Sequence, residues 1–311
     1  MVVFLFPGQG SQFSGMARDL YEKYSTVRDL FSLASDACER DMKALLFEGS
    51  EEELKDTANA QPAIVLASLA AREALRVEGV ESEGAAGHSL GEYSAMVDAG
   101  VLSAADAFKA VSARGRFMAD AGAGITAEKG EIGMAAVVGI SPAVVQDALK
   151  GLPYVWSANE NSPVQVAIGG TKAGMDGAAE ALKAAGARRI IPLKVSCPFH
   201  TPLMAGPGEA MKDFLAGLNF NDPVKKVWSN VKAAPVETGG EARSLLVEQV
   251  THPVRWVELE ASVAALNPSA LYEVGPGAVL SGLWAKSGQG GSCMRAGTLE
   301  DIDKIKTQEN G

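Results

Sequence analysis

The sequence has few of the residues on which several classes of protein depend. Only three cysteines, three histidines and 6% aromatic residues occur among its 311 residues. Cys38, Cys197 and Cys293 are widely spaced, odd in number and form no CxxC pair. We therefore expect no disulfide framework and no metal site, and this cysteine usage favours a reducing compartment.

Positive charge is also scarce, because 28 Lys and Arg face 38 Asp and Glu, giving a formal net charge of −10. An acidic chain is poorly suited to nucleic acid or to an anionic membrane. The apolar start, residues 1–6, is too short for a signal peptide, and no apolar run approaches the roughly 18 residues of a spanning helix. We expect a soluble, cytoplasmic protein; a processed organelle protein would have the same pattern.

The pattern of apolar residues predicts a mostly parallel sheet covered by helices, since strands and helices alternate at both ends of the chain. Expected strands are 2–6, 84–87, 226–229 and 270–274. Expected helices are 13–24, 27–40, 63–77, one after Gly91 that runs to about Asp98, 103–120, 204–218, 242–250, 254–266 and 279–286. The polar tail, 301–311, is expected to fray.

A different pattern occupies the middle of the chain. Residues 121–132 interrupt the helical pattern with glycine and charge. The order that follows is strand, helix, strand, strand, helix, strand, which is typical of a ferredoxin-like unit. We therefore predict a small inserted domain at 128–196 inside a discontinuous large domain, 1–127 and 197–311.

The segment Gly87-His-Ser89-Leu-Gly91 matches the GxSxG pattern between an expected strand and an expected helix. In that context it indicates a nucleophile elbow, in which glycines permit a strained turn that exposes the serine hydroxyl at a helix N-terminus. The alternative is a glycine-rich turn whose serine only caps the helix.

A serine nucleophile needs a base, and the sequence offers three histidines. His88 precedes the serine, so its side chain points the other way, and His252 fits a surface turn before a proline. His200 ends a loop after an expected strand, where catalytic groups of α/β sheets gather. We therefore favour His200. Arg114 lies in an expected helix and is not distinguished by its neighbours.

Nine strings, taken in order, resemble the malonyl-CoA:acyl carrier protein transacylases, the acyltransferases of fatty acid and polyketide synthesis. They are FPGQGSQ (6–12), QPA (61–63), GHSLGEYSA (87–95), RGRFM (114–118), MAAVVG (134–139), NSPVQVAIGG (161–170), FHTPLM (199–204), PVRW (253–256) and YEVGPG (272–277). The resemblance implies an α/β-hydrolase-like core with a ferredoxin-like insertion. It also implies a monomer without a bound cofactor, for which a coenzyme A thioester is the substrate.

The resemblance also implies roles for single residues. Ser89 would carry the malonyl group as an ester, and His200 would move the protons. A backbone carbonyl, here that of Gln249, would orient the histidine in place of an acid. The backbone N–H groups of Gln9 and Leu90 would form the oxyanion hole.

Arg114 would bind the free carboxylate of the malonyl group. The planar guanidinium suits this role, because it holds a carboxylate with two parallel charge-assisted hydrogen bonds. Phe199 and Leu90 resemble the pattern of malonyl-preferring relatives. The enzyme would then supply extender units to acyl carrier protein for fatty acid biosynthesis, or alternatively for a polyketide pathway.

Two other classes remain open. A serine esterase or thioesterase would explain the elbow but expects an acid between serine and histidine in the sequence, for example Asp98, Asp106 or Asp120. A scaffold protein that has lost catalysis would not need Ser89, His200 and Arg114 together.

The implied partner poses an electrostatic problem, since acyl carrier protein is acidic and would be repelled by this chain at long range. One basic string runs from Lys183 through Arg188 and Arg189 to Lys194, and a second is Lys225-Lys226. We predict that Arg188 and Arg189 help to dock the carrier; the alternative is a solvated face.

Overall fold

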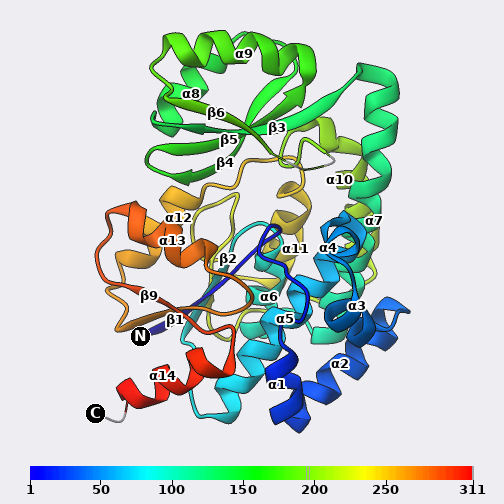
Figure 1. Cartoon of the computed structure of the whole chain (residues 1–311), viewed down its shortest axis with the longest axis vertical. Coiled ribbons are helices and arrows are strands. Elements are labelled where there is room, and N and C mark those ends of the chain that lie inside the picture. The colour runs from blue at the N-terminus through cyan, green and yellow to red at the C-terminus, as the bar shows by residue number, and fades with distance from the viewer. Residues whose placement is uncertain (194, 196, 310–311) are drawn as a thin grey trace.

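The computed structural model describes residues 1–193, 195 and 197–309, which form two layers, each built on one sheet (Figure 1). The larger layer has a five-stranded parallel sheet in the order β7-β2-β1-β8-β9. Its strands are β1 (Val2–Phe6), β2 (Gly84–Gly87), β7 (Lys226–Val227), β8 (Ala270–Glu273) and β9 (Cys293–Arg295). The expected α/β architecture with a parallel sheet is therefore confirmed.

Helices cover both faces of this sheet. They are α1 (Arg18–Lys23), α2 (Ser25–Cys38), α3 (Met42–Glu48), α4 (Glu51–Lys55), α5 (Thr57–Val77), α6 (Gly91–Asp98), α7 (Ala104–Lys129), α10 (Ala205–Ala216), α11 (Gly239–Glu248), α12 (Trp256–Ala264), α13 (Val279–Ser287) and α14 (Leu299–Glu309), with a 3₁₀ turn, η1, at Pro202–Met204.

The central strand β1 shows why the sheet needs helices on both faces. Its side chains alternate between the two faces, as the pleat dictates. Phe4 and Phe6 enter the main core, which includes α5. Val3 and Leu5 enter a second core under α12 and α13. Each fully buried apolar side chain of this size stabilises the fold by about 1.5–3 kcal/mol.

The second layer has a four-stranded antiparallel sheet in the order β4-β5-β3-β6. Its elements are β3 (Ile132–Val138), α8 (Pro142–Leu149), β4 (Val155–Ser162), β5 (Gln165–Thr171), α9 (Lys172–Ala184) and β6 (Arg189–Leu193). They follow one another in the expected order. Val137, Val145 and Leu182 belong to a separate core between this sheet and its helices.

Helix α7 and the segment that precedes α12 both join the two layers. The long helix α7 rises from the larger layer and leads directly into β3 (Figure 1). On the other side, the backbone of Val254 donates to Ala158 O at 2.9 Å and accepts from Glu160 N at 2.8 Å. The edge strand β4 is therefore held to the segment that precedes α12.

The expected break after residue 120 was wrong, because α7 continues to Lys129. Gly122 and Gly124 lie inside the helix, at a cost of about 1 kcal/mol each relative to alanine. Ala121 and Ile125 pack against the main core. Tertiary contacts therefore offset the weak local propensity.

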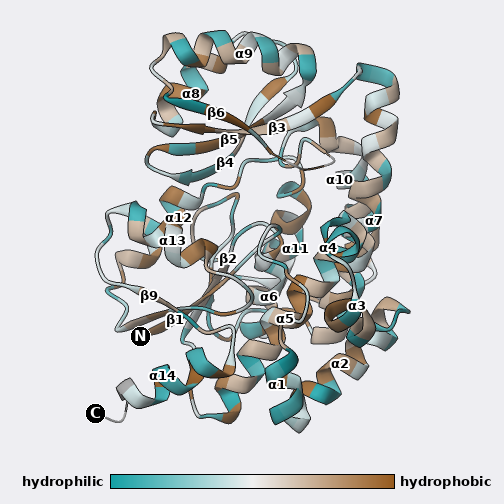
Figure 2. Ribbon diagram, in the orientation of Figure 1, coloured by the Kyte–Doolittle hydropathy of each residue, from teal (hydrophilic) through white to brown (hydrophobic). Residues whose placement is uncertain are grey.

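The expected frayed tail was also wrong over its described part. Ile302 and Ile305 of α14 are fully buried, which anchors the helix; residues 310–311 lie outside the described residues. The short helices α3 and α4 and the strand β9 were not expected at all. Figure 2 shows α14 with hydrophilic residues over much of its length, which is the pattern that suggested fraying.

Candidate active site

Ser89 lies in the tight turn between β2 and α6, with a positive φ of 51°. Such a conformation costs a non-glycine residue on the order of 1–3 kcal/mol. A Cβ on Gly87 would lie 2.0 Å from the Gly91 backbone, and one on Gly91 would lie 2.0 Å from Phe6 O. Both glycines are therefore required for the close approach of strand and helix, as the elbow interpretation expects.

Asn230 holds this turn in place from the loop after β7. Its side-chain oxygen accepts from Ser89 N at 2.6 Å, and its amide nitrogen donates to Gly87 O at 2.6 Å. Both the oxygen and the nitrogen of the Asn230 side-chain amide are thus hydrogen-bonded to the backbone of the elbow. The strained serine is fixed by hydrogen bonds on both of its sides.

Ser89 and His200 are in direct contact, because the serine Oγ lies 2.7 Å from the histidine Nε2. The other ring nitrogen, Nδ1, lies 2.8 Å from the backbone oxygen of Gln249. A carbonyl oxygen only accepts, so Nδ1 carries the proton and Nε2 presents its lone pair to the serine hydroxyl. The three groups form a hydrogen-bonded chain that contains no carboxylic acid.

The environment keeps the imidazole neutral. Burial, and next the nearby Arg114 guanidinium, lower the pKa of His200 to about 3. Both effects oppose a positive charge on the ring. His200 is therefore neutral near pH 7, with its Nε2 lone pair available, and a negative charge that enters the site would stabilise its protonated form.

Arg114 projects from α7 toward the serine and is only 2% exposed. Its Nη1 donates to Gln61 Oε1 at 2.9 Å, and its Nη2 donates to Gln249 Oε1 at 3.0 Å. The Nη2 atom is also 3.5 Å from Ser89 Oγ. The Nε atom is buried without a hydrogen-bond partner. Among the described residues no carboxylate forms an ion pair with this guanidinium.

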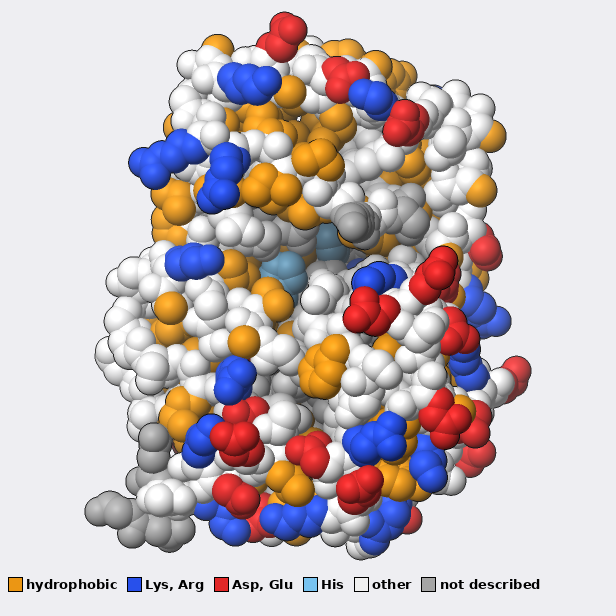
Figure 3. All heavy atoms as spheres, in the orientation of Figure 1, with side chains coloured by type: hydrophobic (Ala, Val, Ile, Leu, Met, Phe, Trp, Pro, Cys, Tyr) orange, Lys and Arg blue, Asp and Glu red, His pale blue; other side chains and the backbone are white. Residues whose placement is uncertain are grey.

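A cavity of about 270 Å³ opens between the two layers and is lined by Ser89, His200 and Arg114. Gln9 and Leu90 line it as well. Figure 3 shows the cavity as a hollow across this face, with histidine side chains inside it. An acyl group bound here would lie against the serine, the histidine and the arginine at once.

His252 lies at an exposed turn, as expected, whereas His88 lines the cavity together with Ser89. The Nε2 atom of His88 is 2.8 Å from Asn161 Oδ1, and its ring packs edge-on against Trp256 at 5.2 Å. Burial lowers the pKa of His88. His252 is exposed, and its Nδ1 lies 2.8 Å from Glu248 O. Neither ring contacts the serine hydroxyl.

Arg188 and Arg189 lie outside the cavity, exposed at the start of β6. Neither takes part in any of the ion pairs of the described chain. Strand β6 leads from these arginines to Leu193, which lines the cavity. Lys194, which ends this basic string, lies outside the described residues.

Sequence reasoning missed three residues that build the site: Gln61, Glu92 and Asn230. The first two lie in the QPA and GHSLGEYSA strings, yet no pattern gave them a role. Glu92 is fully buried, and Asn230 contacts the elbow from a position 141 residues away. The one signal in the sequence was Glu92, a charged residue in the short expected helix that follows the GxSxG segment.

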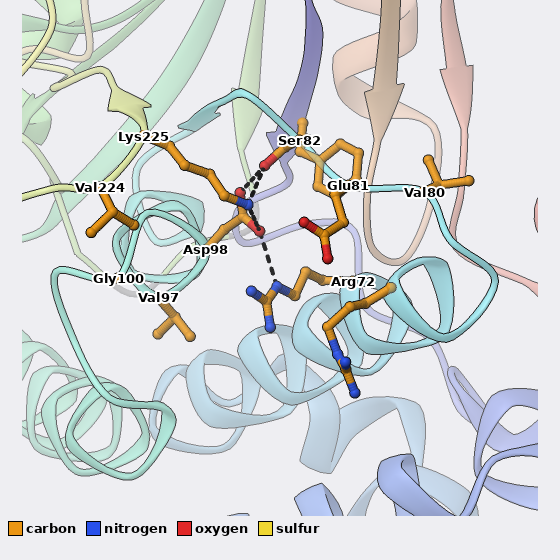
Figure 4. Close-up of a pocket in the computed structure, with 11 residues that line it drawn as sticks. Arg72, Val80, Glu81, Ser82, Val97, Asp98, Gly100, Val224 and Lys225 are labelled. Carbon is orange, nitrogen blue, oxygen red and sulfur yellow. Dashed lines mark hydrogen bonds and ion pairs between the residues drawn. The ribbon is translucent and has the colours of Figure 1, made fainter.

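A second polar cavity, of about 260 Å³, lies at the opposite, amino end of the parallel strands (Figure 4). Here Asp98 accepts from Arg72 Nε at 2.9 Å and from the Ser82 hydroxyl, and it lies 3.7 Å from Lys225 Nζ. Both carboxylate oxygens therefore have protein partners. The cluster ties α5, α6 and the starts of β2 and β7 together.

In the part of the chain that the structure describes, no group of three or more His, Cys, Asp or Glu side chains could hold a metal ion. No helix in that part is long and apolar enough to cross a membrane.

Comparisons with a family model and with curated relatives point to the same family of acyltransferases. Residues 3–301 match the family model described as an acyl transferase domain. The chain is 41% identical over 289 residues to the malonyl CoA-acyl carrier protein transacylase of Bacillus subtilis, covering 92% of this chain and 90% of that protein. It is 42% identical over 286 residues to the enzyme of the same name from Escherichia coli K12, covering 90% of each.

Solved structures agree with the sequence relatives. The malonyl-CoA:acyl carrier protein transacylase of Xanthomonas oryzae has a TM-score of 0.92 and 37% identity, covering 99% of this chain and 98% of that one. A malonyl-transacylase solved with its type II polyketide synthase acyl carrier protein also has a TM-score of 0.92, at 36% identity, covering 100% of this chain and 99% of that one.

Proposed function

The chain belongs to the acyl transferase family and is an acyltransferase of the malonyl-CoA–acyl carrier protein transacylase type; from this we propose that it forms a malonyl ester on Ser89. The malonyl group comes from malonyl-CoA and passes to the phosphopantetheine thiol of an acyl carrier protein. The observation that carries the proposal is the contact of Ser89 with His200 at 2.7 Å beside a buried, unpaired arginine.

In the first half-reaction Ser89 Oγ attacks the thioester carbonyl while His200 Nε2 takes the hydroxyl proton. The backbone N–H groups of Gln9 and Leu90 stabilise the oxyanion. The C–S bond then breaks, and His200 protonates the departing coenzyme A thiolate. Hydrogen bonding of Nδ1 to Gln249 O, at 2.8 Å, keeps the ring in the required tautomer.

The second half-reaction runs these steps in reverse with a different thiol. His200 deprotonates the pantetheine thiol, the thiolate sulfur attacks the ester carbonyl, and the ester C–O bond breaks. The proton on His200 returns to Ser89 Oγ. Because both thiols use the same dyad in turn, the kinetics are ping-pong.

Arg114 selects the acyl group by binding its free carboxylate. A buried guanidinium without an anionic partner is costly, and a malonyl carboxylate removes that cost while an acetyl group does not. The negative acyl group also offsets the positive field at His200, so the imidazolium forms more readily with malonyl bound.

The finer description of the fold follows the same family. The larger layer, residues 1–127 and 197–311, is an α/β-hydrolase-like domain, and residues 128–196 are a ferredoxin-like subdomain inserted in it. The elbow after β2 supports the first assignment, and the order of β3, α8, β4, β5, α9 and β6 supports the second. Residue 196 itself lies outside the described residues. The enzyme acts as a cytoplasmic monomer that holds no cofactor.

The carrier docks beside the cleft on Arg188 and Arg189. Both are exposed, and Figure 3 shows basic side chains on the smaller layer close to the hollow. Charge reversal of both residues should raise the KM for the carrier several-fold and leave malonyl-CoA hydrolysis unchanged. Lys226→Glu, at the amino end of the sheet, is the matched control. An unchanged carrier KM in the double variant would refute this docking site.

The central test uses labelled malonyl-CoA without a carrier, followed by digestion. Label should be found on the peptide that contains Ser89 and be absent from Ser89→Ala, whose transfer rate should fall at least about 10³-fold. Adding a carrier should move the label to its thiol. Release of free malonate alone, with or without a thiol, would favour the esterase alternative. Transfer rates measured with acyl carrier proteins of fatty acid synthesis and of polyketide synthesis would show which of the two pathways the enzyme serves.

A further inference from the structure

A buried carboxylate without an assigned role lies directly beneath the dyad. Glu92, the second residue of α6, is fully buried. Its Oε2 accepts from Gln249 Nε2 at 2.6 Å and from Asn230 N at 3.2 Å. Its Oε1 is buried without a hydrogen-bond partner. A carboxylate in such a place is expensive, so a simple packing role does not explain it.

The side chain of Gln249 bridges this carboxylate and Arg114. Its Oε1 accepts from Arg114 Nη2 at 3.0 Å, and its Nε2 donates to Glu92 Oε2 at 2.6 Å and to Ser89 O at 2.9 Å. A guanidinium only donates and an ionised carboxylate only accepts. The two charges therefore fix which end of the amide faces which neighbour.

This bridge has two consequences for Arg114. The negative charge of Glu92 attracts the guanidinium and offsets part of the cost of its burial. An amide lies between the two groups, so the carboxylate does not occupy the N–H groups. The same bridge leads back to His200, because the backbone oxygen of Gln249 orients the ring at 2.8 Å. One residue thus aligns the proton-transfer base and the acyl-binding arginine.

We propose that Glu92 is a specificity-determining positioning residue, which through the Gln249 amide keeps Arg114 oriented and free to bind the substrate carboxylate. The inference rests on the proposed malonyl transfer, and it names Glu92 as the residue that makes the transfer selective for malonyl over acetyl groups. Protonation or neutralisation of Glu92 weakens the acceptor that holds Nε2, so the Gln249 amide is fixed less firmly and Arg114 loses part of its alignment.

Electrostatics of the site support this role. Burial raises the pKa of Glu92 to about 7, so its charge is sensitive to pH near neutrality. The other titratable groups in the site are Arg114 on α7, His200, and the neighbouring Tyr93, and they do not change charge in this range. Burial raises the pKa of Tyr93 to about 12, and that of His200 is about 3.

The experiment compares malonyl-CoA with acetyl-CoA in Glu92→Gln, Glu92→Asp and the wild type. We expect Glu92→Gln to raise the KM for malonyl-CoA and lower the malonyl-to-acetyl ratio of kcat/KM at least about 10-fold. Modification of Ser89 by phenylmethanesulfonyl fluoride should change less than about threefold, because the dyad is intact. Glu92→Asp keeps the charge and should restore most of the ratio.

Glu260→Gln is the matched control. Glu260 is also fully buried with one unpartnered oxygen, and burial raises its pKa to about 8, but it accepts from Trp256 Nε1 on α12, away from the dyad. Its neutralisation should leave the malonyl-to-acetyl ratio unchanged. An equal loss of ratio in both variants would overturn the proposal, as would an unchanged ratio in Glu92→Gln.

A measurement on the wild type tests the same role without a substitution, so it still applies if Glu92→Gln does not fold. As the pH falls from 8 to 6, Glu92 gains a proton, so the malonyl-to-acetyl ratio should fall several-fold. A constant ratio would overturn the role of Glu92. If the wild type forms no malonyl-Ser89 at all, it is the proposed function that fails.

Discussion

Two arginine clusters lie at opposite ends of the parallel sheet, one partly exposed and one buried, and they use their charge differently. At the amino end, Arg72 Nε contacts Asp98 directly at 2.9 Å, and both oxygens of that carboxylate have partners (Figure 4). At the carboxyl end, Arg114 and Glu92 are separated by the Gln249 amide. Of these two clusters, only the second leaves guanidinium and carboxylate atoms buried without hydrogen-bond partners.

The difference separates a structural ion pair from a binding site. A direct pair satisfies both charges and leaves nothing for a ligand to contribute. A buried guanidinium whose direct hydrogen-bond partners are neutral amides lowers stability, and binding an anion offsets this cost. The amino-end cluster therefore holds helices and strands together, while we propose that the carboxyl-end cluster binds the substrate carboxylate.

The largest expected effect is that of removing each arginine in turn. Arg114→Met should lower kcat/KM for malonyl transfer by roughly 10²–10⁴-fold, because the site loses its charge-assisted contacts to the substrate carboxylate. Acetyl transfer, measured in the same assay, should fall far less. Arg72→Met should change neither rate per folded molecule. Equal losses for both acyl groups in Arg114→Met would show that this arginine only supports the fold.

The sequence predicted the parts of the site that depend on local geometry. Gly87 and Gly91 mark the elbow because no other residue permits the close approach, and elimination among three histidines indicated His200. Local sequence patterns do not show which residues from distant parts of the chain will contact the site. Asn230 reaches the elbow from 141 residues away, and Glu92 has meaning only beside the Gln249 side chain.

The same limit explains the errors in the fold. The end of α7 has glycines and charges that predict a break, and only the packing of Ala121 and Ile125 against the core keeps it helical. Helix α14 is polar along most of its length, so two buried isoleucines were too weak a signal. In both cases tertiary burial outweighed local propensity.

A smaller effect should follow from breaking the direct pair of the amino-end cluster. Asp98→Asn leaves Arg72 and Lys225 without their counter-charge and should lower the free energy of unfolding by about 1–3 kcal/mol, because Arg72 is partly solvated. Urea denaturation measures the change. Transfer activity per folded molecule should be unaffected. Asp176→Asn, which breaks an exposed ion pair with Lys172, is the control and should have no measurable effect. A loss of activity with unchanged stability would contradict the structural role.

The smallest expected effect tests how strongly the charge of each arginine, Arg72 or Arg114, changes the pKa of His200. Phenylmethanesulfonyl fluoride modifies Ser89 only while His200 is neutral, and it carries no carboxylate that could bind Arg114. Because the pKa of His200 is lowered to about 3, the rate in the wild type should change less than about twofold between pH 8 and pH 5. Arg114→Met removes a nearby positive charge, raises the histidine pKa and should move the loss of reactivity to higher pH, whereas Arg72→Met should leave the profile unchanged. If both variants shifted the profile alike, the separation between a structural and a functional arginine would not hold.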